Sequence, residues 1–124
     1  MKLDKFSQDD FIKVFNRFVR FLTRGKTTSS QPKAILLGGQ SGAGKTTIHR
    51  IKQREFQGNI IIIDGDSYRS FHPNYLGLQE KYGKDSVDYT KVFAGQMVEY
   101  LVEELSKKGY HLLIEGTLRT TEVP

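Results

Sequence analysis

The chain contains no cysteine, which excludes disulfides, thiolate nucleophiles and zinc-thiolate sites, so any chemistry must come from oxygen and nitrogen groups. It also lacks any apolar run near the ~20 residues that a membrane span needs. The N-terminal stretch MKLDKFSQDD offers no apolar core for a signal peptide. We therefore expect a cytoplasmic protein with no membrane segment.

Positive charge is in excess but is not gathered in one place. The net charge of +5 would suit an anionic partner, and nucleic acid is the first to consider. Lysines and arginines are nevertheless spread from Lys2 to Arg119 among acidic residues, without a long basic run or an aromatic-basic repeat. Nucleic-acid binding is therefore not expected.

Length and composition indicate one folded domain spanning 1–124. A chain of 124 residues has room for a single core. Hydrophobic residues make up 37% of it and include 8 Phe, which is enough apolar material to exclude a disordered chain. No internal repeat or low-complexity segment is present.

An amphipathic helix is predicted at 8–24, with Ser7 as its N-cap and Gly25 as the residue that stops it. Its apolar residues recur at helical spacing and are Phe11, Val14, Phe15, Phe18 and Leu22. Such a stripe more often packs against a core than binds a partner, although an apolar helix face can also dock another protein. We favour packing.

The rest of the sequence alternates between strand and helix patterns. Apolar runs predict strands at 34–37, 60–63 and 111–114, and helical spacing predicts helices at 45–56 and 86–108. An irregular loop is expected around Phe71, His72 and Pro73. The order strand, helix, strand, helix, strand requires right-handed crossovers and a parallel sheet. The predicted class is therefore α/β, a parallel sheet flanked by helices.

One motif specifies chemistry. The stretch Gly39-Gln40-Ser41-Gly42-Ala43-Gly44-Lys45-Thr46 fits the P-loop pattern G-x-x-x-x-G-K-[ST], and 34–46 thus reads as a strand followed by a P-loop. Its glycines let backbone amides converge on phosphate oxygens at a positive helix end. We expect Lys45 to reach the β- and γ-phosphates of ATP and Thr46 to bind Mg²⁺, with Thr47 completing the ATP site. The alternative is a glycine-rich turn, which the flanking strand and helix disfavour.

Acidic residues follow the other two predicted strands. Asp64 and Asp66 lie where parallel sheets bind ligands, and a carboxylate there can accept the proton of an attacking hydroxyl. For Asp64, capping of a loop or helix is an equally good interpretation. Glu115 either holds Mg²⁺, as in a Walker B element, or binds substrate. Arg119 can bind an anionic group or be a solvated surface residue. His72 is interpreted as structural.

The stretches AILLGGQSGAGKTTIHRI, IIIIDGDSYRSFHPNY and HLLIEGTLRTTEVP resemble the zeta toxins of bacterial toxin-antitoxin systems, and the similarity covers nearly the whole chain. That resemblance implies a P-loop kinase fold and phosphorylation of the sugar 3′-hydroxyl of UDP-N-acetylglucosamine with ATP and Mg²⁺. It implies that Lys45 and Asp66 are catalytic, with Asp66 as the base. The implied sugar-nucleotide contacts are Glu99, Glu115, Thr117 and Arg119. It also implies an antitoxin that packs near the helix at 8–24 and obstructs the ATP site.

Zeta toxins continue well past the position of Pro124, with further strands and a lid that supplies arginines to the transferring phosphate. Because such an arginine is worth ~10³–10⁵ in rate, we expect this chain to be a partial domain that ends after its third strand and transfers no phosphate alone. The resemblance implies a strand order with 60–63 outermost, then 111–114, then 34–37. Without a further strand this order leaves the strand at 34–37 as an exposed apolar edge.

Two alternatives to this kinase remain open. One is a catalytically silent fragment that binds nucleotide or antitoxin, which the absence of lid arginines favours. The other is a P-loop kinase for a different small hydroxyl substrate. Such a kinase would share the P-loop and Asp66 but would not need Glu99, Thr117 and Arg119.

Overall fold

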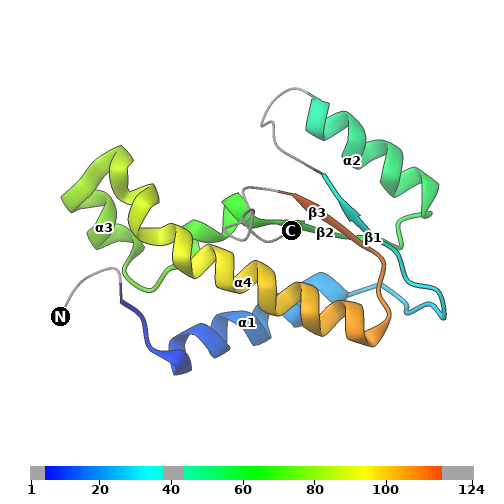
Figure 1. Cartoon of the computed structure of the whole chain (residues 1–124), viewed down its shortest axis with the longest axis horizontal. Helices are drawn as coiled ribbons and strands as arrows, with labels where there is room; N and C mark the ends of the chain where they lie inside the picture. Colours follow the sequence, from blue (N-terminus) through cyan, green and yellow to red (C-terminus); the bar gives the residue numbers. More distant parts are fainter. Residues whose placement is uncertain (1–4, 38–43, 116–124) are drawn as a thin grey trace.

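The predicted alternation of strands and helices is present in the computed structural model, which describes residues 5–37 and 44–115 (Figure 1). The elements in chain order are α1 (Gln8–Thr23), β1 (Ala34–Leu36), α2 (Gly44–Glu55), β2 (Ile61–Asp64), η1 (Gly65–Phe71), α3 (Tyr75–Tyr82), η2 (Gly83–Ser86), α4 (Val87–Lys108) and β3 (Leu112–Glu115). The predicted bounds of these strands and of α1, α2 and α4 differ from the observed ones by only a residue or two, as helix and strand ends usually do.

The three described strands form one parallel sheet in the order β1-β3-β2. Every residue of the central strand β3 is buried, as expected of a strand covered on both faces. Among the described strands β1 pairs only with β3, and its Leu36 is 68% exposed. The predicted strand order and the predicted apolar edge are both confirmed.

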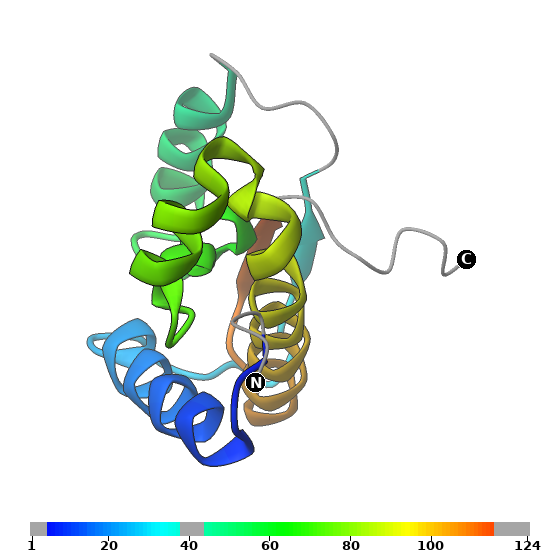
Figure 2. The ribbon, with the colours of Figure 1, turned by 90° about the vertical axis from the view of Figure 1, so that its left-hand side faces the viewer.

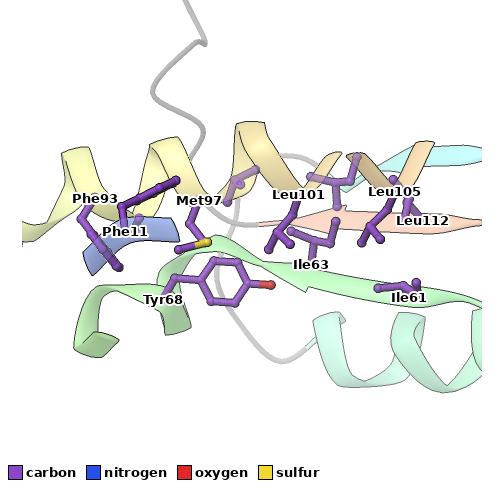
Figure 3. Packing of buried hydrophobic residues seen from close by; sticks show 12 residues of the cluster. Phe11, Ile61, Ile63, Tyr68, Phe93, Met97, Leu101, Leu105 and Leu112 are labelled. Carbon is purple, nitrogen blue, oxygen red and sulfur yellow. The ribbon is translucent and has the colours of Figure 1, made fainter. Parts of the chain in front are cut away.

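The sheet is covered on both faces, by α4 on one and α2 on the other (Figures 1 and 3). Figure 3 shows Met97, Leu101 and Leu105 of α4 pointing toward β2 and β3. All three side chains are 0% exposed. Burying a side chain of this size contributes roughly 1.5–3 kcal/mol, so this layer fixes α4 to the sheet. No helix in the described ranges is long and apolar enough to cross a membrane.

Helix α1 lies alongside α4 and begins at a side-chain cap (Figure 2). The Ser7 hydroxyl accepts a hydrogen bond from the Asp10 N–H at 3.0 Å, the expected N-cap geometry. Phe11 is fully buried and its ring meets those of Phe93 and Tyr100, at centroid distances of 5.6 and 4.9 Å. The rest of the predicted stripe is partly buried against the same core. The prediction that this face packs is confirmed.

The segment between β2 and α4 is more regular than predicted. The irregular loop predicted around Phe71, His72 and Pro73 is present at residues 72–74, between η1 and α3. The flanking η1, α3 and η2 were not predicted, and α3 lies at the N-terminal end of α4 (Figure 2). Helix α3 was missed because it buries only Leu78 and so has no apolar period. It ends at Gly83, whose φ of 58° suits glycine.

His72 has the structural role predicted for it. It is 3% exposed, and its ring lies against Phe6 and Phe93. Its Nδ1 accepts a hydrogen bond from the Asn74 N–H at 3.0 Å, which shapes the turn into α3. These contacts hold the imidazole inside the core.

Candidate functional site

The carboxyl edge of the sheet gathers the acidic residues that end two strands. Asp64 and Glu115 are the last residues of β2 and β3, and they lie opposite each other in register. Helix α2 starts at this edge, since it follows the end of β1 (Figure 1). Open parallel sheets bind their ligands at this edge, so it is the candidate site.

The P-loop is described only where it enters its helix. Gly39, Gln40, Ser41, Gly42 and Ala43 lie outside the described residues, and so do Thr117 and Arg119. The backbone from Gly44 onward is helical, so Gly44 and Lys45 open α2 as the P-loop pattern requires. Thr46 and Thr47 are exposed in its first turn, where free backbone N–H groups favour phosphate.

Asp66 is held half-buried in η1, directly after β2. Its Oδ1 accepts a hydrogen bond from Nη1 of Arg69 at 2.9 Å. The turn that carries Asp66 packs tightly on α4, because a Cβ on Gly65 would come within 2.9 Å of Cγ2 of Val98. Glycine at this position therefore lets η1 approach α4 and places Asp66 at the sheet edge.

A cavity of about 140 Å³ lies between η1 and α4, beside Asp66. The charged side chains lining it are Asp66, Arg69 and Lys91. The rest of its wall is small or apolar and consists of Gly65, Val87, Ala94 and Gly95. A carboxylate with two cations on an otherwise apolar wall suits a small ligand that carries hydroxyl and phosphate groups.

Glu99 does not line this cavity. It is exposed on α4, one helical turn beyond Gly95. The structure describes two of the predicted sugar-nucleotide residues. Glu99 is exposed on the surface of α4, whereas Glu115 is buried at the sheet edge.

Glu115 meets a residue to which the sequence had assigned no role. Its carboxylate is 2% exposed, and its Oε2 contacts Nε2 of His49 in α2. His49 follows Lys45 and Thr46 by one helical turn, so all three positions share a face of α2. That spacing is the signal that could have identified it.

Asp64 occupies the N-cap position of η1, but its side chain makes no capping hydrogen bond. Instead its backbone carbonyl accepts one from the Ser67 hydroxyl at 2.8 Å. The Asp64 carboxylate therefore does not cap η1. Nearby, burial raises the pKa of the Tyr68 phenol well above its usual range, so Tyr68 stays neutral in the core.

The donor atoms at this edge fit a magnesium ion. The Thr46 hydroxyl and the Glu115 carboxylate are oxygen ligands of the kind that Mg²⁺ prefers. Within the described ranges, no three His, Asp or Glu side chains cluster as metal ligands. Mg²⁺ in phosphoryl-transfer sites is usually held by one or two side chains together with the phosphates.

A P-loop sequence that opens a helix, a parallel sheet flanked by helices and acidic residues at its carboxyl edge together define a kinase-type P-loop fold. The zeta toxin family model matches residues 19–124. The chain therefore belongs to the zeta toxin family.

Individual relatives agree with this assignment. The chain is 67% identical over its whole length to toxin PezT of Streptococcus pneumoniae, of which it covers 49%. It is 46% identical over 103 residues to toxin zeta of Enterococcus hirae, covering 36% of that protein. A solved structure from the PezAT chromosomal toxin-antitoxin system of Streptococcus pneumoniae superposes with a TM-score of 0.93 at 68% identity. The chain spans about half the length of PezT and of the solved chain, 49% and 51% respectively.

Proposed function

We propose that these residues form the nucleotide-binding part of a kinase that transfers phosphate from ATP to the sugar 3′-hydroxyl of UDP-N-acetylglucosamine, as the toxin of a toxin-antitoxin system. The observation that carries this proposal is Asp66, which follows the carboxyl end of β2 and lines the cavity between η1 and α4. Membership of the zeta toxin family supports the kinase class and the toxin role.

The proposed residues divide between binding ATP, binding the sugar nucleotide and accepting a proton. Lys45 and the backbone amides of 39–47 hold the phosphates of ATP, and Asp66 accepts the proton of the attacking 3′-hydroxyl. Mg²⁺ held by Thr46 neutralises phosphate charge when bound. The proposed contacts to the sugar nucleotide are Glu99, Glu115, Thr117 and Arg119. Glu115 serves either the sugar nucleotide or Mg²⁺, since its carboxylate lies at the edge that both would share.

An antitoxin is the proposed protein partner, and α1 offers a surface for it. A groove of about 240 Å³ on α1 is lined by Val14, Arg17, Phe18, Phe21 and Phe71. Phe21 is 64% exposed and Phe71 is 42% exposed. An exposed apolar groove beside an arginine suits the apolar face of an amphipathic helix, which is a common mode of partner binding.

The experiment joins residues 1–124 to the part of pneumococcal PezT that this chain does not cover, because the two are 67% identical over the 49% of PezT that it does cover. We expect this chimaera, given Mg²⁺, ATP and UDP-N-acetylglucosamine, to form a new phosphate monoester on the sugar, visible by ³¹P NMR. Asp66→Asn is the matched control and should abolish transfer while ATP affinity stays within about tenfold.

A folded chimaera that binds Mg-ATP but leaves the sugar nucleotide unmodified would contradict the proposed reaction. Faster phosphorylation of another hydroxyl compound in direct competition would contradict the proposed substrate. Retained transfer in Asp66→Asn would contradict the assignment of the base.

A further inference from the structure

Helix α2 carries one polar side chain into the site that is not part of the P-loop motif, that of His49. Nε2 of His49 contacts Oε2 of Glu115, which joins α2 to the carboxyl end of the central strand β3. His49 lies on the face of α2 that also carries Lys45 and Thr46. The contact therefore connects the phosphate-binding helix to the acid at the sheet edge.

The burial of Glu115 makes this contact chemically significant. Its side chain is 2% exposed, and a buried carboxylate is tolerated only when hydrogen bonds or opposite charge compensate its lost hydration. The carboxylate can only accept, so Nε2 of His49 must carry a hydrogen to bond with it. The His49 side chain is 28% exposed, so it bridges the protein interior and the surface of α2.

We propose that His49 is a positioning residue that fixes the carboxylate of Glu115 at the mouth of the nucleotide site by donating a hydrogen bond from Nε2. His49 acts through Glu115 and contacts neither nucleotide nor acceptor. The inference rests on the proposed function, since it gives Glu115 an orientation that Mg²⁺ or the sugar nucleotide requires. Partners that orient the groups around a metal typically change its affinity by ~10–100-fold when mutated.

The first test needs no nucleotide. The chain has 3 histidines, and ¹⁵N NMR of histidine-labelled protein reports which ring nitrogen of each carries the proton. The signal of His49 is identified by its loss in His49→Gln. We expect a protonated Nε2 in His49. A neutral ring protonated only at Nδ1 would overturn the proposal, because no donor would then face Glu115.

The second test compares the affinity for ATP with and without Mg²⁺ by titration calorimetry. Glutamine places its amide nitrogen where Nε2 of histidine lies, asparagine places it where Nδ1 lies, and leucine has no donor. We expect His49→Gln to keep the gain in affinity that Mg²⁺ provides. In His49→Asn and His49→Leu we expect the gain in ATP affinity that Mg²⁺ provides to be roughly tenfold smaller than in wild type. If His49→Leu does not fold, the comparison of the glutamine and asparagine variants decides.

The outcomes separate this role from the proposed function. A folded wild-type chain that binds no Mg-ATP would refute the proposed function and this role with it, whatever the NMR result. A wild-type chain that binds Mg-ATP, with the same gain from Mg²⁺ in all variants, would refute the positioning role alone. An equal loss in the glutamine and leucine variants would refute it as well, since a donor at the Nε2 position would not restore the gain.

Discussion

Nη1 of Arg69 lies 2.9 Å from Oδ1 of Asp66, one turn earlier in η1. The two side chains are 30% and 37% exposed, so solvent screens the pair and its contribution to stability is small. Its main consequence is orientation, because the contact holds one carboxylate oxygen of the proposed base while the carboxylate lines the cavity.

Arg69→Gln in the chimaera should therefore lower kcat by roughly tenfold or more, since a misplaced base loses near-attack geometry. Lys91→Gln is the matched control, because it removes a cation from the same cavity without a contact to Asp66. Steady-state kinetics should show a smaller fall in kcat for the control. Equal effects of the two variants would indicate that only the charge of the cavity matters.

The parts of the fold that the sequence predicted are those with a strong local pattern. The isoleucine run of β2 and the P-loop pattern each specify an element, and the alternation of strands and helices predicts a parallel sheet. The order of its strands was instead implied by the resemblance to zeta toxins. Helix α3 could not be predicted, because a helix with one buried residue is held by its surroundings rather than by its own periodicity.

The candidate site, like the fold, was predicted from the sequence only in part. Motif and strand ends predicted where Thr46, Asp66 and Glu115 would lie, since all parallel strands end at one edge. The contact from His49 to Glu115 and the cavity beside Asp66 depend on how α2 and α4 pack against the sheet. Helical spacing could have placed His49 on the face of α2 shared with Lys45 and Thr46, but its contact with Glu115 depends on the packing of the folded chain.

The exposed edge of the sheet should make the chain self-associate. Leu36 is 68% exposed on β1, an edge among the described strands, and unpaired edge backbone invites pairing with a second chain. Sedimentation velocity should show oligomers that grow with concentration, and Leu36→Lys should shift them toward monomer. Leu76→Lys is the control, because Leu76 is 78% exposed but lies on α3. Monomers at all concentrations, or the same shift in both variants, would contradict this prediction.

Burial of Tyr68 should make the chain unfold more easily at alkaline pH. Burial raises the pKa of Tyr68 in the folded state, so in the unfolded state this phenol ionises first, near its ordinary value of about 10. The stabilisation is complete below that pH and is lost as the pH rises further. We expect the urea midpoint to fall less steeply with pH in Tyr68→Phe than in wild type. The measurement runs from about pH 8 to about pH 11, on either side of the ordinary tyrosine pKa. Tyr75→Phe should behave as wild type, and an unchanged slope in Tyr68→Phe would contradict the prediction.

The layer between α4 and the sheet should dominate stability. Leu101 is 0% exposed and points from α4 toward β2 and β3 (Figure 3), so Leu101→Ala should cost about 2–5 kcal/mol of unfolding free energy. Val92→Ala on the same helix should cost much less, because Val92 is 41% exposed. Urea unfolding followed by circular dichroism measures both, and similar losses in the two variants would contradict the assignment of the core.

The phosphates of ATP are proposed to bind at the start of helix α2, where Gly44 and Lys45 form its first residues. Titration calorimetry of the folded chain with Mg-ATP tests this central claim most directly. We expect saturable binding in wild type and an affinity at least about tenfold lower in Lys45→Ala, since a charge-assisted hydrogen bond to phosphate contributes about 1.5–3 kcal/mol. No binding by the folded wild-type chain, or the same affinity in Lys45→Ala, would contradict the claim.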